Sequence, residues 1–141
     1  MTASALASLT RSVCLPARAA GMSVADLIAR EGPASLGLQP ALPPLSGWTS
    51  LSAPHVAVRE EQEGCVVETV LDARRAEAAL PPLRQALTWF GEEAFLRGPG
   101  AYAYCADARA VAVLLRVPSE DGEQLAVLTG KARARCPTGS R

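Results

Sequence analysis

Polar and apolar residues alternate most clearly in two neighbouring stretches near the middle of the chain. Residues 55–60 (HVAVRE) and 65–71 (CVVETVL) are rich in β-branched side chains, and the polar segment EQEG separates them. Such runs predict strands whose successive residues face opposite sides, and Gly64 suits the turn between them. We therefore expect a β-hairpin over 55–71, in which Val56 and Val58 share one face.

The segment before this hairpin predicts a short helix followed by extended chain. Ser23 is a suitable helix cap, and the residues after it at helical spacing are Val24, Leu27 and Ile28. A Gly-Pro pair ends this helix, which we expect over about 23–31. Prolines recur through 33–54, so this stretch is expected to be extended, with Trp48 as its large anchor and an additional strand within 45–52.

A longer helical region follows the hairpin. Asp72 suits the cap of a helix over 73–79, and Pro81 with Pro82 is expected to restart the helix at its first turn. The second part, over 83–96, has one apolar face that consists of Leu83, Ala86, Leu87, Phe90 and Ala94.

The last third of the chain returns to strand patterns. The run AYAYCADARAVAVLLRVP predicts two strands around a turn at 106–109, and we expect this pair at the centre of the sheet. One face of its second strand consists of Val111, Val113, Leu115 and Val117. Ser119 and the two acids after it favour a final helix over about 120–134.

These elements predict an α+β fold, a mostly antiparallel sheet flanked by helices, in the order α-β-β-(β)-α-β-β-α. Residues 23–135 are expected to form a single domain and 136–141 a flexible tail. Residues 1–22 carry two arginines, many small residues and no acid. This composition predicts a disordered or non-native extension, with a targeting peptide as the alternative.

Composition narrows the classes of partner. Lys plus Arg equals Asp plus Glu at 14 each, so no net charge attracts nucleic acid or an anionic membrane. No stretch approaches the roughly 20 apolar residues of a membrane span. We therefore expect neither nucleic acid nor membrane as a partner.

The cysteines lie far apart in the sequence, at Cys14, Cys65, Cys105 and Cys136. No C-x-x-C motif is present, so neither a redox pair nor a zinc knuckle is indicated. A chain of this length and apolar content does not need disulfides in order to fold, although two disulfides are permitted by number. We expect reduced, mostly buried thiols in a cytoplasmic protein.

Candidate catalytic chemistry is sparse. The one histidine, His55, has no Ser or Cys motif beside it and is expected at a strand end on the surface. The acid pairs 60–61, 92–93 and 120–121 place adjacent carboxylates in different directions, which favours solvated edges over acid–base pairs. We expect no catalytic residue, no metal site and no cofactor.

Two further features have only a superficial likeness to ligand sites. Gly98-Pro99-Gly100 follows a predicted helix and precedes a strand, the reverse of the order in phosphate loops. Tyr102 and Tyr104 share a strand face, but the basic residues of a nucleobase-stacking platform are missing around them. Packing in the core or in an interface is the favoured role of both tyrosines.

A family resemblance rests on the order LIAREGPASLGLQPAL, a hairpin, LPPLRQAL and GAYAYCADARAVAVLLRVPSEDGEQLAVL. This succession resembles the Tir chaperone (CesT-like) family of class I type III secretion chaperones over about residues 23–130. The resemblance implies a cytoplasmic homodimer that binds an unfolded segment of a secreted effector protein. It implies partner-binding residues on apolar patches and sheet edges, namely Leu27, Ile28, Leu36, Leu38, Val56, Val58, Val66 and Val70. It also implies a dimer interface that consists of Leu83, Leu87, Trp89 and Phe90, although these residues equally suit an ordinary core.

Other functions remain open from the sequence. A different interaction or regulatory module, a small enzyme with an unrecognised site, and an imported subunit that loses its first 22 residues are the alternatives. A chaperone predicts exposed apolar grooves, whereas an enzyme predicts a concave pocket with convergent polar groups.

Overall fold

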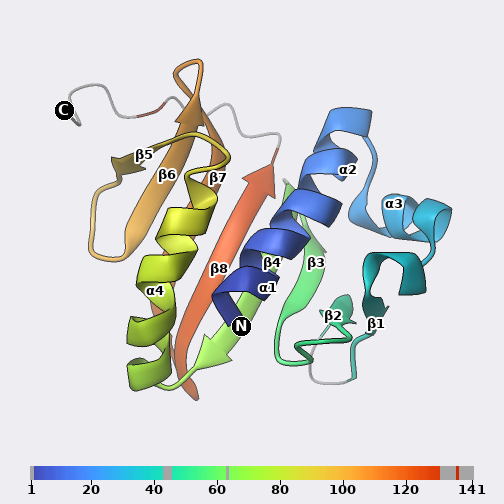
Figure 1. Ribbon diagram of the computed structural model, residues 1–141, viewed down its shortest axis with the longest axis horizontal. Helices are drawn as coiled ribbons and strands as arrows, with labels where there is room; N and C mark the ends of the chain where they lie inside the picture. Colours follow the sequence, from blue (N-terminus) through green and yellow to red (C-terminus); the bar gives the residue numbers. More distant parts are fainter. Residues whose placement is uncertain (1, 43–45, 63, 131–135, 137–141) are drawn as a thin grey trace.

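One eight-stranded antiparallel sheet extends across the whole molecule (Figure 1). The computed structural model describes residues 2–42, 46–62, 64–130 and 136. The strands are β1 (Leu38–Pro40), β2 (Trp48–Ser50), β3 (Ala57–Glu61), β4 (Gly64–Leu71), β5 (Glu92–Phe95), β6 (Ala101–Ala106), β7 (Arg109–Ser119) and β8 (Gly122–Gly130). Their order in the sheet is β1-β2-β3-β4-β8-β7-β6-β5. The predicted α+β class with a mostly antiparallel sheet is confirmed.

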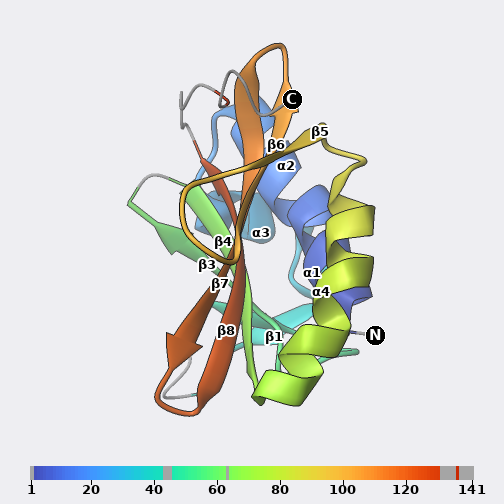
Figure 2. The same ribbon diagram turned by 90° about the vertical axis from the view of Figure 1, so that its left-hand side faces the viewer.

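The helices cover one face of this sheet, as the edge-on view shows (Figure 2). They are α1 (Thr2–Leu9), the π-helical turn η1 (Thr10–Cys14), α2 (Leu15–Ala20), α3 (Val24–Glu31), the 3₁₀ turn η2 (Ala34–Leu36) and α4 (Ala73–Leu87). Leu6 and Val13 from the first helical stretch, and Leu83 and Leu87 from α4, are fully buried. Their burial against the sheet forms the hydrophobic core.

The chain consists of two halves of similar order, each a helical stretch followed by a four-stranded meander. The last strands of the halves, β4 and β8, pair antiparallel in the middle of the sheet, from Gly64↔Gly130 to Leu71↔Glu123. An antiparallel pair of this kind relates the two halves by an approximate two-fold axis perpendicular to the sheet. The predicted central position of the β6–β7 pair is therefore wrong, since β4 and β8 occupy the centre.

The turns of the two inner hairpins show this relation in detail. The β3–β4 hairpin closes at Glu61↔Gly64, and the β7–β8 hairpin closes at Ser119↔Gly122. A Cβ on Gly64 would lie 2.4 Å from the Thr129 carbonyl oxygen, and one on Gly122 would lie 2.3 Å from the Leu71 carbonyl oxygen. Each hairpin turn thus packs on the far end of the opposite central strand, an approach that only glycine allows.

Several local predictions are confirmed. The hairpin over 55–71 forms as β3 and β4, and the additional strand within 45–52 is β2. The predicted helix over 23–31 is α3, in which the Ser23 hydroxyl accepts a hydrogen bond from the Asp26 amide at 3.0 Å. That bond satisfies one of the free amides of the first turn, as expected for a helix cap.

The disorder predicted for the N-terminal residues is not found. Residues 2–20 are helical, not disordered, and they lie across the sheet in the core. The buried residues recur every three or four positions along α1, η1 and α2, namely Ala3, Leu6, Leu9, Val13, Cys14 and Ala17. This spacing gives the stretch one continuous apolar face, which the sheet covers.

The region after β4 differs from its prediction in two ways. One helix, α4, continues through Pro81 and Pro82, both of which are exposed. Its buried face, Ala76, Leu80, Leu83 and Leu87, packs on the core, and this burial offsets the backbone bonds that the prolines cannot form. The helix then ends at Leu87, and β5 replaces its predicted continuation to residue 96.

The predicted final helix over 120–134 is also wrong. Ser119 to Gly122 form the β7–β8 turn, and Gly122–Gly130 is a strand. Apolar residues lie on both faces of β8, so its pattern lacks a clean strand alternation. The rest of the predicted helix, and of the predicted tail over 136–141, lies outside the described residues except for Cys136.

The prediction of reduced cysteines is wrong as well. Cys14 of η1 forms a disulfide with Cys65 of β4, and Cys105 of β6 forms one with Cys136. The first pair is buried in the core, whereas Cys105 and Cys136 are half-buried. The covalent bond to β4 fixes the N-terminal helical stretch on the sheet.

Among the described helices, none alone has the length and apolar character to cross a membrane. Thr2–Ala20 and Val24–Glu31, a pair bent by 107°, meet the length and composition of a span when they are combined.

Candidate protein-binding surface

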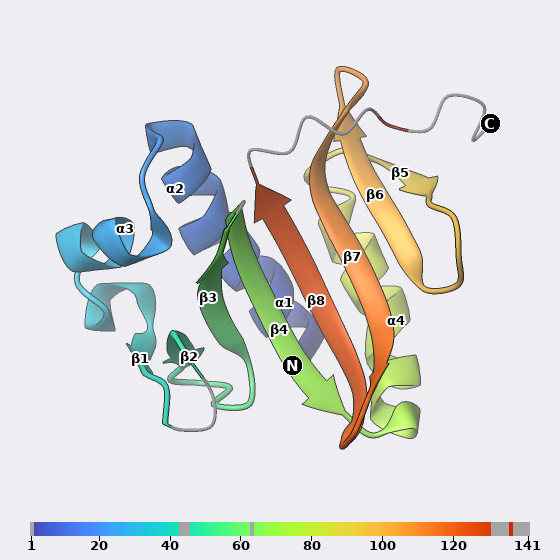
Figure 3. The same cartoon turned by 180° about the vertical axis from the view of Figure 1, so that it is seen from behind.

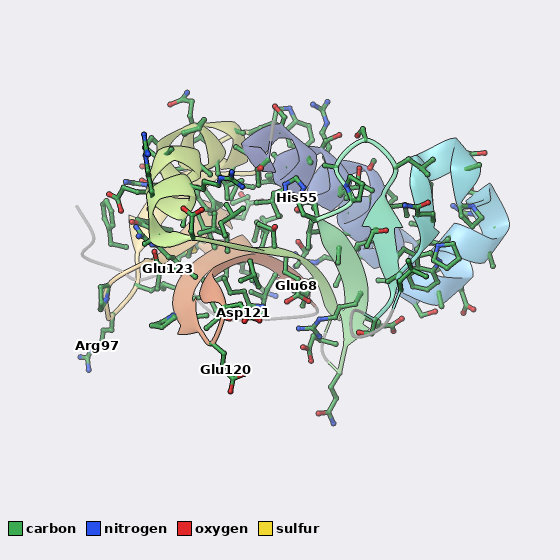
Figure 4. All side chains as sticks on the ribbon, turned by 90° about the horizontal axis from the view of Figure 1, so that it is seen from below. His55, Glu68, Arg97, Glu120, Asp121 and Glu123 are labelled. Atoms are coloured by element: carbon green, nitrogen blue, oxygen red, sulfur yellow. A yellow bond between two sulfur atoms is a disulfide. The ribbon has the colours of Figure 1, made fainter. Side chains whose placement is uncertain are left out.

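The candidate catalytic groups are dispersed or already paired. His55 is exposed beside the N-terminal helix, where its Nε2 lies 2.9 Å from the Thr2 hydroxyl (Figure 4). The hollow of about 670 Å³ beside it also contains Asp72 and Arg75. Asp72 accepts the Arg75 amide at 2.9 Å as the cap of α4 and also pairs with the Arg75 side chain. These polar groups therefore serve the helix start, and nothing in them converges on a substrate.

The three acid pairs do not form acid–base pairs either. Glu60 accepts the Val24 amide at 3.0 Å, while Glu61 pairs with Arg59. Glu120 and Asp121 are exposed at the β7–β8 turn (Figure 4). Among the described residues, no group of three or more His, Cys, Asp or Glu side chains could hold a metal ion.

Most residues predicted to bind a partner lie in the core of the monomer. The buried ones are Leu27, Ile28, Leu38, Val56, Val58 and Val66, of which only Val66 lies on the face of the sheet away from the helices. Leu36 is half-buried, and Val70 is 44% exposed. Because a buried side chain cannot contact a partner in the folded chain, Val70 and Leu36 are the members of this set that remain at the surface.

The predicted dimer residues divide in the same way. Leu83 and Leu87 are fully buried beneath α4, and Phe90 is 8% exposed. Trp89 is 57% exposed and is the one residue of the four available to a partner. The apolar stripe of α4 packs on its own sheet, which corrects its assignment as a dimer interface.

Among the described residues, no helix lies on the face of the sheet opposite α1 and α4 (Figure 3). One row of paired residues crosses five strands on this face, through Val66, Leu128, Val113, Ala103 and Ala94. On β7 the face continues with Leu115 and Val117, and on β8 with Gln124 and Ala126. We call these residues, together with Ala101 and Val70, the open face.

The open face departs from the usual chemistry of a solvated sheet. An antiparallel sheet with one wet face normally alternates apolar and polar side chains. From Val113 to Val117 on β7 and from Gln124 to Leu128 on β8, this face carries no charged side chain. An apolar depression of about 190 Å³ lies at one end of it, lined in part by Val66, Val111 and Leu128.

An ionic cluster borders the open face on β3 and β4. Arg59 donates to Glu61 and Glu68, and the Gln124 amide also donates to Glu68. Glu68 is 17% exposed at its side chain, so three strands enclose its carboxylate within this group. An apolar centre with a polar rim is the typical composition of a protein interface.

Aromatic side chains gather at the other end of the sheet. The chain has two Trp, two Tyr and two Phe residues, and all except Trp48 lie at the end of α4 or on β5 and β6. We call these residues the aromatic cluster, which consists of Trp89, Phe90, Phe95, Tyr102 and Tyr104. Trp89 packs edge-on against Phe90 with ring centroids 5.0 Å apart, and Phe95 packs edge-on against Tyr102 at 5.7 Å.

Two arginines lie over these rings. The Arg11 guanidinium is 3.9 Å from the centroid of Trp89, and the Arg84 guanidinium is 4.4 Å from that of Tyr102. Trp89 and Phe95 nevertheless remain 57% and 59% exposed. Exposed Trp, Tyr and Arg side chains are enriched at the energetic centres of protein interfaces.

A buried network supports the aromatic cluster. Arg84 donates two hydrogen bonds to Glu93, at 3.1 and 2.7 Å, and the buried Tyr104 hydroxyl donates to the same carboxylate at 2.8 Å. The bonds from Arg84 hold the pKa of Glu93 below its ordinary value. Burial, followed by the bond to Glu93, raises the pKa of the Tyr104 hydroxyl.

We expect Glu93→Gln to lower the free energy of unfolding by about 2 kcal/mol at pH 7, because Arg84 loses its charged partner. Glu93 has a lower pKa in the folded chain, so its contribution is present above the ordinary value of 4.5 and is lost as the pH falls through the folded pKa. The two proteins should therefore converge in stability in acid. Urea unfolding at pH 7 and pH 3 measures both effects, with Glu120→Gln at an exposed turn as the control. An equal loss at both pH values would contradict the assigned role of the charge.

Comparisons with known proteins identify no relative. No protein family model, no curated protein and no solved structure matches the chain. The surface described above therefore rests on the chain's own geometry. The sequence predicts Tyr102 and Tyr104 on one strand face, but it does not predict the aromatic cluster, because Trp89 and Phe95 fall within the predicted helix over 83–96.

Proposed function

We propose that this protein binds another protein chain and holds an unfolded or extended segment of it. The observation that supports this proposal is the open face, an apolar sheet surface that no described helix covers, on which Val70 and Val117 are 44% and 37% exposed. An exposed apolar patch with a polar border is typical of a protein interaction site. An extended segment of the partner that lies on this face can bury its apolar side chains against the sheet, so the partner needs no defined fold.

The small-enzyme alternative has less support. The hollow beside His55 contains Asp72 and Arg75, which are engaged in capping α4. The depression on the open face is lined mainly by apolar residues, so it offers few groups for proton transfer. Binding to a protein surface is the function that the described geometry favours.

A substitution of the open face tests this proposal. We expect the oxidised full chain to slow the aggregation of reduced, carboxymethylated lactalbumin, a chain that cannot refold. The double variant Leu115→Gln with Leu128→Gln places polar groups on the open face and should lose most of this effect. The matched control, Leu42→Gln with Leu51→Gln, changes two leucines that are 79% and 51% exposed outside this face. Equal activity of both variants would contradict the proposal, provided that circular dichroism shows both to be folded.

The narrower form of the proposal is a chaperone for an effector of type III secretion, which acts as a cytoplasmic homodimer. Two disulfides favour an oxidising compartment over the cytoplasm, so they argue against this setting and not against the binding itself. Light scattering of the full chain, alone and with the protein encoded beside it in the genome, tests the narrower form. A homodimer that forms a stable complex with that neighbour would support it, and a monomer that binds nothing would contradict it.

A further inference from the structure

Strand β5 is an exposed edge of the sheet. It pairs with β6 on one side, and no described strand lies on its other side (Figures 1 and 3). The opposite edge, β1, has three residues and ends in Pro40, which has no amide hydrogen to offer. Proline and short length are common means by which proteins block an edge strand. Strand β5 contains no proline.

The hydrogen-bond phase of β5 follows from its pairing. The Leu96 amide donates to the Ala101 carbonyl oxygen at 3.1 Å, which sets the alternation along this antiparallel pair. Residues two and four positions before Leu96, Ala94 and Glu92, therefore also direct their backbone groups toward β6. The backbone groups of Glu93 and Phe95 consequently point away from the sheet.

The side chains of the same two residues lie on the helix side. Glu93 pairs with Tyr104, and Phe95 with Tyr102, so both belong to the face of the aromatic cluster. Arg84 and Tyr104 engage the Glu93 carboxylate, so this acid is neutralised within the protein. Phe95 remains 59% exposed beside backbone groups that have no neighbouring strand.

The positive charges near β5 indicate a further property of the partner, an acidic group. Arg97 follows Phe95 by two residues and extends away from the body of the molecule (Figure 4). Neither Arg97 nor Arg11, which lies over Trp89, forms an ion pair with a described residue. An acidic group on the partner is complementary to these exposed guanidinium groups.

We propose that β5 is the docking edge for an extended segment of the bound protein, which adds to the sheet as a ninth strand. The segment has large apolar side chains at alternate positions, and these contact Phe95 and the rest of the aromatic cluster. It also has a carboxylate that meets Arg97. This inference rests on the proposed function, and it adds to the open face a second contact site, at the β5 edge, for an extended segment of the same bound protein.

Strand addition makes a sharp prediction about the client backbone. Residues opposite each other across a sheet share a face, so the apolar residues of the segment lie opposite Glu93 and Phe95. When the segment runs antiparallel to β5, as neighbouring strands of this sheet do, those apolar residues are the ones whose amides bond to β5. The intervening residues direct their amides to solvent.

A synthetic peptide tests this arrangement. The probe has the sequence Asp-Thr-Val-Thr-Phe-Thr-Val-Thr-Asp and a fluorescent label, and its binding to the oxidised full chain is measured by anisotropy. We expect N-methylation of the Val and Phe amides to weaken binding at least about tenfold. N-methylation of the last three of its four Thr amides should leave binding within about twofold of the parent peptide.

Two variants at one position separate the backbone from the side chain. Phe95→Ala removes the ring and retains the outward amide, whereas Phe95→Pro removes both without breaking a bond to β6. We expect the parent peptide to bind Phe95→Ala several-fold more weakly than the natural chain, and Phe95→Pro more weakly again. Thermal unfolding of each variant confirms that the sheet is intact.

The outcomes distinguish this inference from the proposed function. Equal binding of all three peptides, or equal binding to both variants, would overturn strand addition at β5. A chain that binds no peptide but still protects carboxymethylated lactalbumin would overturn the docking edge and leave the proposed function supported. A chain that does neither would overturn both.

Discussion

A chain that begins at Met22 is expected to be unfolded at 25 °C. The missing residues include Leu6, Leu9 and Val13, which are 0%, 6% and 0% exposed in the full chain. Burial of each such side chain contributes roughly 1.5–3 kcal/mol. The sum approaches the total stability of about 5–15 kcal/mol that a small domain has. Deletion also exposes the apolar faces of α4 and β4 to water.

Circular dichroism and urea unfolding of residues 22–141 measure this effect against the full chain. Two point variants separate burial from helix length. We expect Leu6→Ala to cost about 3 kcal/mol, because it leaves a cavity beneath α1. Ser4→Ala, at an exposed position of the same helix, should change stability by less than about 0.5 kcal/mol. A cooperative transition of the fragment at the midpoint of the full chain would contradict the core position of the N-terminal stretch.

Local signals made part of the fold predictable. The Ser23 cap and the β-branched runs around Gly64 act through neighbouring residues, and the structure contains both elements where they were expected. The class of fold followed from such elements. The strand order did not, because pairing of β4 with β8 joins segments more than fifty residues apart.

The failed predictions share a physical cause, which is burial by distant parts of the chain. The N-terminal stretch has helical spacing, but its small residues offer little stability until the sheet covers them. In α4, burial of Leu83 and Leu87 outweighs the local effect of two prolines. In β8, both faces are apolar, and pairing with β4 and β7 decides in favour of a strand.

The candidate surface was predictable only in part. Alternation predicts Val111, Val113, Leu115 and Val117 on one face, and the pairing with β8 confirms this for the last three. Val111 lies at a register shift and packs against the core, so its predicted face is wrong. The sequence has no signal for which face the helices cover. In β7 the smaller Ala112 is buried with Leu114 in the core, and Val113 and Val117 lie on the open face. The aromatic cluster depends on β5, which sequence analysis assigned to a helix.

Loss of the Cys14–Cys65 disulfide is expected to have the second largest effect on stability. The two residues are 51 positions apart, and the chain-entropy account gives about 4 kcal/mol for a loop of this size. Cys14→Ala with Cys65→Ala should therefore lower the free energy of unfolding by about 3–4 kcal/mol, since alanine leaves no buried polar group. Urea unfolding of the oxidised proteins measures the difference. An unchanged midpoint would contradict the stabilising role of this bond.

Exposure to a reductant distinguishes this disulfide from the other. Cys14 and Cys65 are 1% and 4% exposed, whereas Cys105 and Cys136 are half-buried near the β6–β7 turn. In native buffer we expect dithiothreitol to reduce Cys105–Cys136 first, and mass spectrometry of alkylated samples to show two modified thiols before four. The buried pair should react only as fast as the chain opens, because a thiolate must reach its sulfur atoms. When the second pair is reduced, we expect the N-terminal stretch to leave the core. The covalent bond and the burial of this stretch therefore depend on each other.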